Sequence, residues 1–133
     1  MTTPTSPEML VPRAVEASGN AYAPFSKFQV GAAIVVEDGS VFVGCNVENS
    51  SYGLTLCAER NAIFAAVAAG HRKLKAVAVV AKGDPLPWPC GACRQVIAEF
   101  AEPDCPIYVA SVDNPTHIES TTLGDLLPHS FRL

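Results

Sequence analysis

The chain has 133 residues, which is room for one domain of ordinary size and not for two. Its 13 acidic residues outnumber 9 basic ones, and a net charge of −4 gives no basic surface for a phosphate backbone, so nucleic acid is excluded as a partner. The longest apolar run, residues 62–69, is far shorter than a membrane span, and residues 1–12 lack the features of a signal peptide, so we expect a soluble, cytoplasmic protein without membrane contact.

The N-terminal part of the chain predicts a tail and a helix. Residues 1–6 have the polar, proline-containing composition of a disordered tail. A helix is expected from Pro7 to about Ala21, although Pro12 favours a later start because proline fits poorly inside a helix. Residues 22–26, with a proline among them, predict a turn.

A β-hairpin is expected next. Residues 28–36 are nearly all apolar toward their end, as in a strand that is buried on both faces. Asp38-Gly39 is a strong turn signal, so residues 41–48 should pair antiparallel with that strand. A loop over residues 50–55 follows.

The second half alternates helices and strands. An alanine-rich segment that ends at Gly70 is apolar nearly all round, which predicts a central, buried helix. Together these elements indicate an α/β sheet with helices on its faces, in a single domain over residues 7–133. The expected elements are helices at residues 56–69 and 91–100, strands at 74–81, 106–112 and 118–122, a proline-dense loop at 82–89 and a helical turn at 123–127.

Three of the five cysteines form a pattern typical of a catalytic metal site. Cys57, Cys90 and Cys93 stand at the starts of the two predicted helices, where free backbone N–H groups favour the thiolate form. Zinc prefers four tetrahedral ligands, and a site with three protein ligands leaves one position for water or substrate. The pattern therefore predicts one zinc ion with an open position, whereas Cys45 and Cys105 are expected to be ordinary buried thiols.

Two charged residues accompany the first cysteine. Glu59 follows Cys57 by two residues, so it should face the same pocket from within the first helical turn. A carboxylate at that place can take a proton from a metal-activated water and pass it to a substrate nitrogen. Three thiolates on a dication carry a net charge of about −1. We expect Arg60 to offset part of that charge by bonding to the thiolates.

Other functions fit the Cys90-x-x-Cys93 pair as well. A four-cysteine zinc ribbon is excluded because the chain has no second C-x-x-C pair. A thiol–disulfide exchange site stays open, since Trp88 stands before the pair as in thioredoxin-like motifs. That alternative leaves Cys57 and Glu59 unexplained.

Four ordered blocks of sequence resemble the small, three-cysteine cytidine deaminases of the cytidine and deoxycytidylate deaminase superfamily. The C-x-E and P-C-x-x-C spacings match the pattern known for zinc deaminases. The resemblance extends over residues 22–131, which is nearly the whole chain. The matching blocks are residues 25–33, 46–53, 57–60 and 89–96.

The resemblance implies a three-layer α-β-α fold with a mixed five-stranded sheet in the order 2-1-3-4-5. It implies hydrolytic deamination of cytidine and deoxycytidine to uridine and deoxyuridine plus ammonia, as in pyrimidine salvage. In that reaction a zinc-bound hydroxide attacks C4 of the pyrimidine while Glu59 moves the protons. One Zn²⁺ per subunit and a homotetramer, with sites completed by neighbouring subunits, are also implied.

The same resemblance assigns the substrate contacts. Asn46 and Glu48 are two residues apart in a predicted strand, so they share a face, and the resemblance places them on the ribose hydroxyls. The residue between them, Val47, should then face the core. Further contacts implied by the resemblance are Phe28 against the pyrimidine, Ala58, Tyr52 near the subunit junction, and Phe131 from a neighbouring subunit.

Two more alternatives stay open at this point. A related deaminase that acts on a nucleoside antibiotic such as blasticidin S would share the zinc motif, although Phe28 and residues 46–49 favour the plain nucleoside. A non-catalytic nucleotide-binding module would bind cytidine without turnover.

Overall fold

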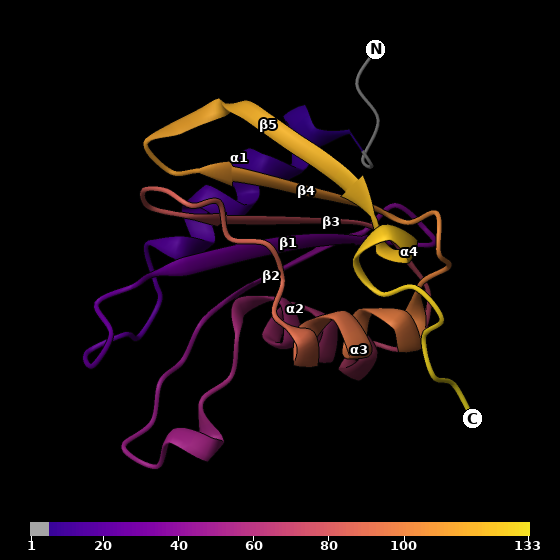
Figure 1. The fold of residues 1–133 in the computed structure, drawn as a ribbon, viewed down its shortest axis with the longest axis horizontal. Helices are drawn as coiled ribbons and strands as arrows, with labels where there is room; N and C mark the ends of the chain where they lie inside the picture. The colour runs from indigo at the N-terminus through magenta and orange to yellow at the C-terminus, as the bar shows by residue number, and fades with distance from the viewer. Residues whose placement is uncertain (1–5) are drawn as a thin grey trace.

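The computed structural model describes residues 6–133, and apart from Ser6 the predicted N-terminal tail lies outside the described residues. Its centre is a five-stranded sheet in the order β2-β1-β3-β4-β5, as the resemblance implies (Figure 1). β3 and β4 pair in parallel, and the other neighbouring strands pair antiparallel. The strands are β1 (Val30–Val36), β2 (Val41–Cys45), β3 (Leu74–Ala81), β4 (Pro106–Ser111) and β5 (Asn114–Thr122).

Helices cover both faces of the sheet and make a three-layer α-β-α arrangement. α1 lies on one face, while α2 and α3 lie side by side on the other (Figure 1). α4 follows β5 and lies against α3. The helices are α1 (Pro7–Ser18), α2 (Ala58–Ala68), α3 (Gly91–Phe100) and α4 (Leu123–Leu126), with a 3₁₀ turn at Tyr52–Leu54.

The central strands are buried on both sides, as their apolar sequences predict. In β1, Ile34 packs into the core under α2 and α3, whereas its neighbour Val35 packs into the core under α1. β3 divides its side chains in the same way, with Val79 on the first side and Val80 on the second. Burial on both faces fixes the register of these strands. β3 ends at the loop that leads to α3.

Two glycines let the helices approach the sheet closely. A Cβ at Gly31 would lie 2.0 Å from the Ala14 carbonyl oxygen of α1, and one at Gly44 would lie 2.5 Å from the Ala58 carbonyl oxygen of α2. No side chain larger than hydrogen fits at either place without moving a helix backbone. Gly44 therefore sets how deeply the first turn of α2 sits on the sheet.

The first helix begins where it was predicted and ends earlier. α1 begins at Pro7, as predicted, and contains Pro12, which does not move its start to a later residue. Its apolar side chains, such as Leu10, are fully buried against the sheet, and this packing outweighs the single hydrogen bond that Pro12 removes. The helix ends at Ser18 and not at Ala21, because the Gly19, Asn20 and Ala21 amides donate within a closing turn.

The hairpin strands are shorter than predicted. β1 begins at Val30, which pairs with Ala81 of β3, and the Asn46 side chain binds the Phe28 carbonyl and the Val30 N–H. β2 ends at Cys45, and Val47 beyond it is 46% exposed, so the prediction that Val47 faces the core is wrong. The chain leaves the regular sheet there to form the rim of a cavity.

Two further predictions need correction. α2 is buried on one face only, since Phe64 on its outer face is 45% exposed in the single chain. β5 begins at Asn114, four residues before the predicted Ile118, because its first residues are polar and exposed and give no apolar signal. No helix within residues 6–133 combines the length and apolarity that a membrane span needs.

Candidate metal centre and adjoining cavity

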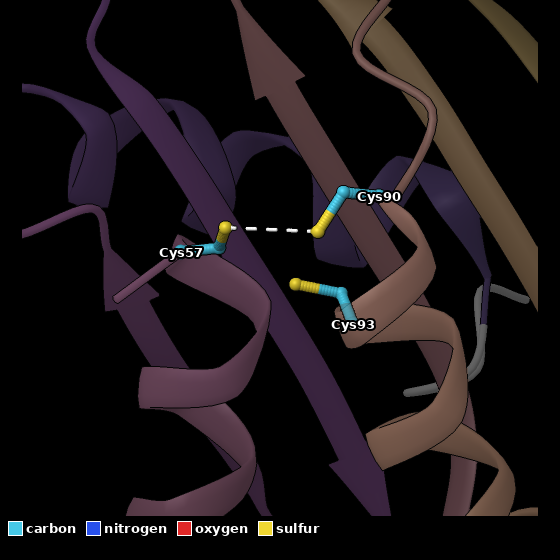
Figure 2. Close-up of side chains that lie close together, drawn as sticks. All are labelled: Cys57, Cys90 and Cys93. Carbon is cyan, nitrogen blue, oxygen red and sulfur yellow. Dashed lines mark hydrogen bonds between the residues drawn. The ribbon is translucent and has the colours of Figure 1, made fainter. Parts of the chain in front are cut away.

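Two helix N-termini meet at one place on the sheet and bring the three predicted cysteines together (Figure 2). Cys57 is the N-cap residue of α2, and Cys90 is the N-cap residue of α3. Cys93 lies in the first turn of α3 and is fully buried. All three thiols therefore point at the positive ends of helix dipoles, which stabilise thiolate charge.

The distances between the sulfurs fit a tetrahedral ion. The Sγ atoms of Cys57 and Cys90 are 3.9 Å apart, and all three sulfurs lie within 4.8 Å of one another. A disulfide would need a separation of about 2.05 Å. Zinc–sulfur bonds of about 2.3 Å place two tetrahedral sulfurs about 3.8 Å apart. Three thiols at this spacing fit zinc with one position left for a non-protein ligand.

Hydrogen bonds among these side chains favour charge on Cys57. The pKa of Cys57 is lowered to about 5, first by the hydrogen bond from Cys93 and then by Arg60, whose Nη2 donates to the Cys57 sulfur over 3.4 Å. The same contact with Cys57, together with burial, raises the pKa of the Cys93 thiol. Arg60 thus bonds to a site sulfur, as the net charge of three thiolates on a dication predicted.

Glu59 is a buried carboxyl beside the sulfurs. It is 4% exposed and lies in the first turn of α2, with Cys57 at the cap before it, as the spacing predicted. Burial raises the pKa of Glu59 to about 7, and the negative charge of Cys57 contributes in the same direction. A group with a pKa near neutrality both accepts and releases a proton readily, as general acid–base catalysis requires.

A cavity of about 220 Å³ opens beside these groups. Four of the predicted substrate contacts line it, namely Phe28, Asn46, Glu48 and Ala58, together with Cys57 and Glu59. Sequence reasoning missed the remaining lining residues. Ser26 lies within a matched block and could have been found there, whereas the apolar members gave no signal of their own. The missed residues are Ser26, Val30, Thr55, Leu56, Val79 and Pro87.

Asn46 and Glu48 hold the far wall of the cavity in place. The Asn46 amide accepts a hydrogen bond from the Val30 N–H (2.9 Å) and donates to the Phe28 carbonyl (2.8 Å). Glu48 Oε1 accepts from the N–H groups of Phe25 (3.0 Å) and Ser26 (3.1 Å), and Oε2 accepts from the Ser26 hydroxyl. Each side chain keeps hydrogen-bonding capacity for a ligand beyond these bonds.

The structure does not bring Tyr52 and Phe131 into this cavity. Tyr52 is 75% exposed and packs edge-on against Phe25, with ring centroids 6.1 Å apart, beside a neighbouring hollow. Phe131 is 68% exposed, and its carbonyl accepts a hydrogen bond from Gln95. Both aromatic rings therefore face outward from the single chain.

The other two cysteines stay apart from this centre. Cys105 is buried, and burial raises the pKa of its thiol to about 12, in contrast to the lowered pKa of Cys57. Cys45 on β2 is half-buried, and burial raises its pKa too. Both are packing thiols, with Cys45 less enclosed than predicted.

Three thiols at two helix starts, a buried carboxyl beside them and an adjoining cavity define a class of protein. This arrangement is that of a zinc hydrolase, in which a metal activates water and an acidic residue moves protons onto the substrate.

Comparison with known proteins gives the family within that class. Residues 4–109 match the family model described as "Cytidine and deoxycytidylate deaminase zinc-binding region". A cytidine deaminase of Sporosarcina psychrophila is 50% identical over 124 residues, which are 93% of this chain and 90% of that relative. The crystal structure of cytidine deaminase from Burkholderia pseudomallei superposes with a TM-score of 0.87 at 48% identity, covering 93% of this chain and 98% of that one. The chain belongs to the cytidine and deoxycytidylate deaminase family.

The comparisons also bear on the antibiotic alternative. A blasticidin-S deaminase of Bacillus cereus is 29% identical over 111 residues, well below the likeness to the cytidine deaminases. The greater similarity favours the plain nucleoside enzymes.

Proposed function

We propose that the protein catalyses the zinc-dependent hydrolytic deamination of cytidine and deoxycytidine, which yields uridine or deoxyuridine and ammonia in pyrimidine salvage. The observation that carries this proposal is a cluster of three thiols, all within 4.8 Å, beside a cavity that Cys57 and the buried Glu59 line. The family and the cytidine deaminases similar to this chain at up to 50% identity support the same activity.

Each residue at the centre has a distinct task. Cys57, Cys90 and Cys93 would hold zinc, which as a Lewis acid makes water a strong nucleophile toward C4 of the pyrimidine. Glu59 takes one proton of that water and delivers it to N3 of the ring; it then takes the second proton from the hydroxyl now on C4 and delivers it to the amine, which departs as ammonia while C4 becomes a carbonyl. Its pKa of about 7 suits both proton transfers. Arg60 offsets charge on the sulfurs through its bond to Cys57.

The opposite wall of the cavity would bind the nucleoside. Asn46 and Glu48 have free lone pairs, and Asn46 a free N–H, for the ribose hydroxyls, while Phe28 packs against the pyrimidine and Ala58 lines the wall. A site built to bond a hydroxyl discriminates strongly against analogues without it. This wall would therefore select the sugar, while the metal centre and Glu59 perform the reaction.

We also propose that four chains assemble and complete one another's sites. Apolar side chains around the cavity and on α2 are exposed in the single chain, which is unfavourable in water unless another surface covers them. They include Phe25, Tyr52, Leu54, Phe64 and Phe131. Phe131 would then contact the substrate in the site of a neighbouring subunit, and Tyr52 would lie at the junction between subunits. Sedimentation should give about 56 kDa for four chains of 14.0 kDa; a 14 kDa species with full activity would contradict this.

The cytoplasm is the proposed place of action. The thiols of the zinc site must stay reduced to bind metal, and the cytosol keeps thiols reduced. Mass spectrometry of protein alkylated in intact cells would find the three site cysteines unoxidised if this location is right.

The test of the function is ammonia release from cytidine, deoxycytidine and blasticidin S by the zinc-loaded protein. We expect ammonia release from both nucleosides. The release should stop when zinc is removed and return when zinc is restored. Release from blasticidin S alone would favour the antibiotic enzymes. Binding of cytidine without turnover, or disulfide reduction by zinc-free protein, would contradict the proposal.

A further inference from the structure

The three sulfur ligands are not equally well held by the protein. Cys93 is fully buried inside α3, and Cys57 accepts a hydrogen bond from Arg60. Cys90 is exposed and is the N-cap residue of α3, so burial does not fix its side chain, and its carbonyl is tied to the helix by the Arg94 N–H over 2.9 Å. On its other side, the position of Cys90 depends on the backbone that leads into it.

That backbone is poor in hydrogen-bond donors. The loop at residues 82–89 contains Pro85, Pro87 and Pro89, and proline has no N–H to tie the chain down. Pro89 immediately precedes Cys90, so rotation about this junction would swing the Cys90 sulfur away from its two partners. Pro89 is itself buried, and a side chain that bonds its carbonyl would add to this packing in holding the junction.

Arg94 contacts this junction directly. From the second turn of α3 its Nε donates to the Pro89 carbonyl over 2.6 Å, and its Nη1 donates to the Leu126 carbonyl over 3.0 Å. The guanidinium is half-buried, which strengthens charge-assisted bonds of this kind. Leu126 is the last residue of α4, from which the chain runs on to Phe131 along α3.

We infer that Arg94 is a positioning residue: by bonding the Pro89 and Leu126 carbonyls it holds Cys90 in place as a metal ligand and ties the metal centre to the C-terminal segment. The planar guanidinium offers two donor nitrogens with fixed spacing to the two carbonyls, whereas lysine has a single donor nitrogen. The inference rests on the proposed zinc-dependent function.

The experiment follows zinc release from the loaded protein into an excess of a chromogenic chelator. Arg94→Met removes both bonds and keeps the apolar stem, and zinc should leave about 10-fold to 100-fold faster, the usual loss when a group that orients a ligand is removed. Arg94→Lys can reach only one carbonyl and should give an intermediate rate.

Arg72 supplies a matched control. Its guanidinium also donates to two backbone carbonyls, those of Val67 (3.0 Å) and His71 (2.8 Å), but at the end of α2 that is far from the sulfurs. Arg72→Met should release zinc at the wild-type rate. Melting temperatures of all variants would separate a general loss of stability from a specific loss of zinc.

Each outcome decides the matter. Faster release from both Arg94 variants, with Arg72→Met unchanged, supports the inference. Wild-type release rates in Arg94→Met, or in Arg94→Lys if the first variant does not fold, overturn it, even if the melting temperature falls. A wild-type protein that holds no zinc would instead contradict the proposed function.

Discussion

The two halves of the site, the metal centre and the opposite wall of the adjoining cavity, are built in different ways. The metal half takes Cys57, Glu59, Cys90 and Cys93 from the caps and first turns of two helices, so regular backbone places the reacting groups. The half that we propose to bind the sugar, here called the sugar half, is irregular except for Val30, the first residue of β1. Its two segments, residues 22–30 and 46–48, are held by side chains that bond backbone 16 to 23 positions away in sequence.

This difference predicts which substitutions affect catalysis alone and which affect substrate binding. In the metal half a side chain can change while the helix around it keeps its shape. In the sugar half Asn46 and Glu48 both line the cavity and hold the loop, so we expect their loss to affect substrate binding and local structure together. The predictions that follow test this contrast, starting with the largest effect.

The largest effect is expected from Cys57→Ala. Two sulfurs cannot replace three, so zinc content should fall far below one per chain and turnover should be lost. Elemental analysis and absorbance assays measure both quantities. Cys45→Ala is the control, because Cys45 lies outside the cluster and should leave the zinc content unchanged. Full zinc content in Cys57→Ala would show that the metal half is wrongly assigned.

Glu48→Gln should harm binding and spare the metal. The amide keeps the size of the side chain but loses the charge that strengthens the bonds from Phe25 and Ser26. Weaker bonds let the loop move away from the cavity, so KM for cytidine should rise by about an order of magnitude. Steady-state kinetics with zinc analysis provides the measurement. An unchanged KM, or a loss of zinc, would remove the distinction between the halves.

Asn46→Ala should affect stability and KM together. Losing the amide leaves the Val30 N–H without its partner, which costs about 1 to 3 kcal/mol of unfolding free energy. Asn61→Ala is the matched control. The Asn61 amide donates to the Cys45 carbonyl with a donor–acceptor distance of 2.8 Å, and neither residue lines the cavity. Denaturant unfolding should find both variants destabilised, but only Asn46→Ala with a raised KM. Equal KM values in the two would contradict the double role of Asn46.

The smallest effect concerns the charge of Glu48. Its pKa lies below the ordinary 4.5, first because the Ser26 hydroxyl bonds the ionised form. A lowered carboxyl pKa gives stability that is present above the ordinary value and lost as pH falls through the lowered one. Ser26→Ala should therefore raise the pKa of Glu48 toward 4.5, as a carbon-detected NMR titration would measure. A titration identical to wild type would mean that Ser26 does not hold this carboxylate.

The sequence predicted most of the metal half. β3 and α3 have the predicted bounds, because a continuous apolar run and a Pro-Cys-Gly start are strong local signals. The C-x-E and C-x-x-C spacings likewise placed Cys57 at a cap and Glu59 in the first turn. These features depend on residues close together in the chain.

The sugar half was harder to predict for a physical reason. Its geometry depends on pairings between distant segments, so the early end of β2 and the exposure of Val47 had no local signal. Two kinds of hydrogen bond are also invisible to sequence periodicity, because side chains make them: those that Glu48 accepts from backbone N–H groups and the one that Arg94 donates to the Pro89 carbonyl. Exposed Tyr52 and Phe131 were predicted to act across subunits, and a single chain leaves that prediction untested.

The most direct test of the account is the zinc content and turnover of Glu59→Gln beside wild type. The amide has the same shape but cannot take the proton of water or pass it to N3, so kcat should fall about 100-fold to 10,000-fold. Zinc should remain at one per chain in both proteins, since Glu59 is not one of the three sulfur ligands. A variant that keeps its zinc and deaminates cytidine at close to the wild-type rate would contradict the central claim.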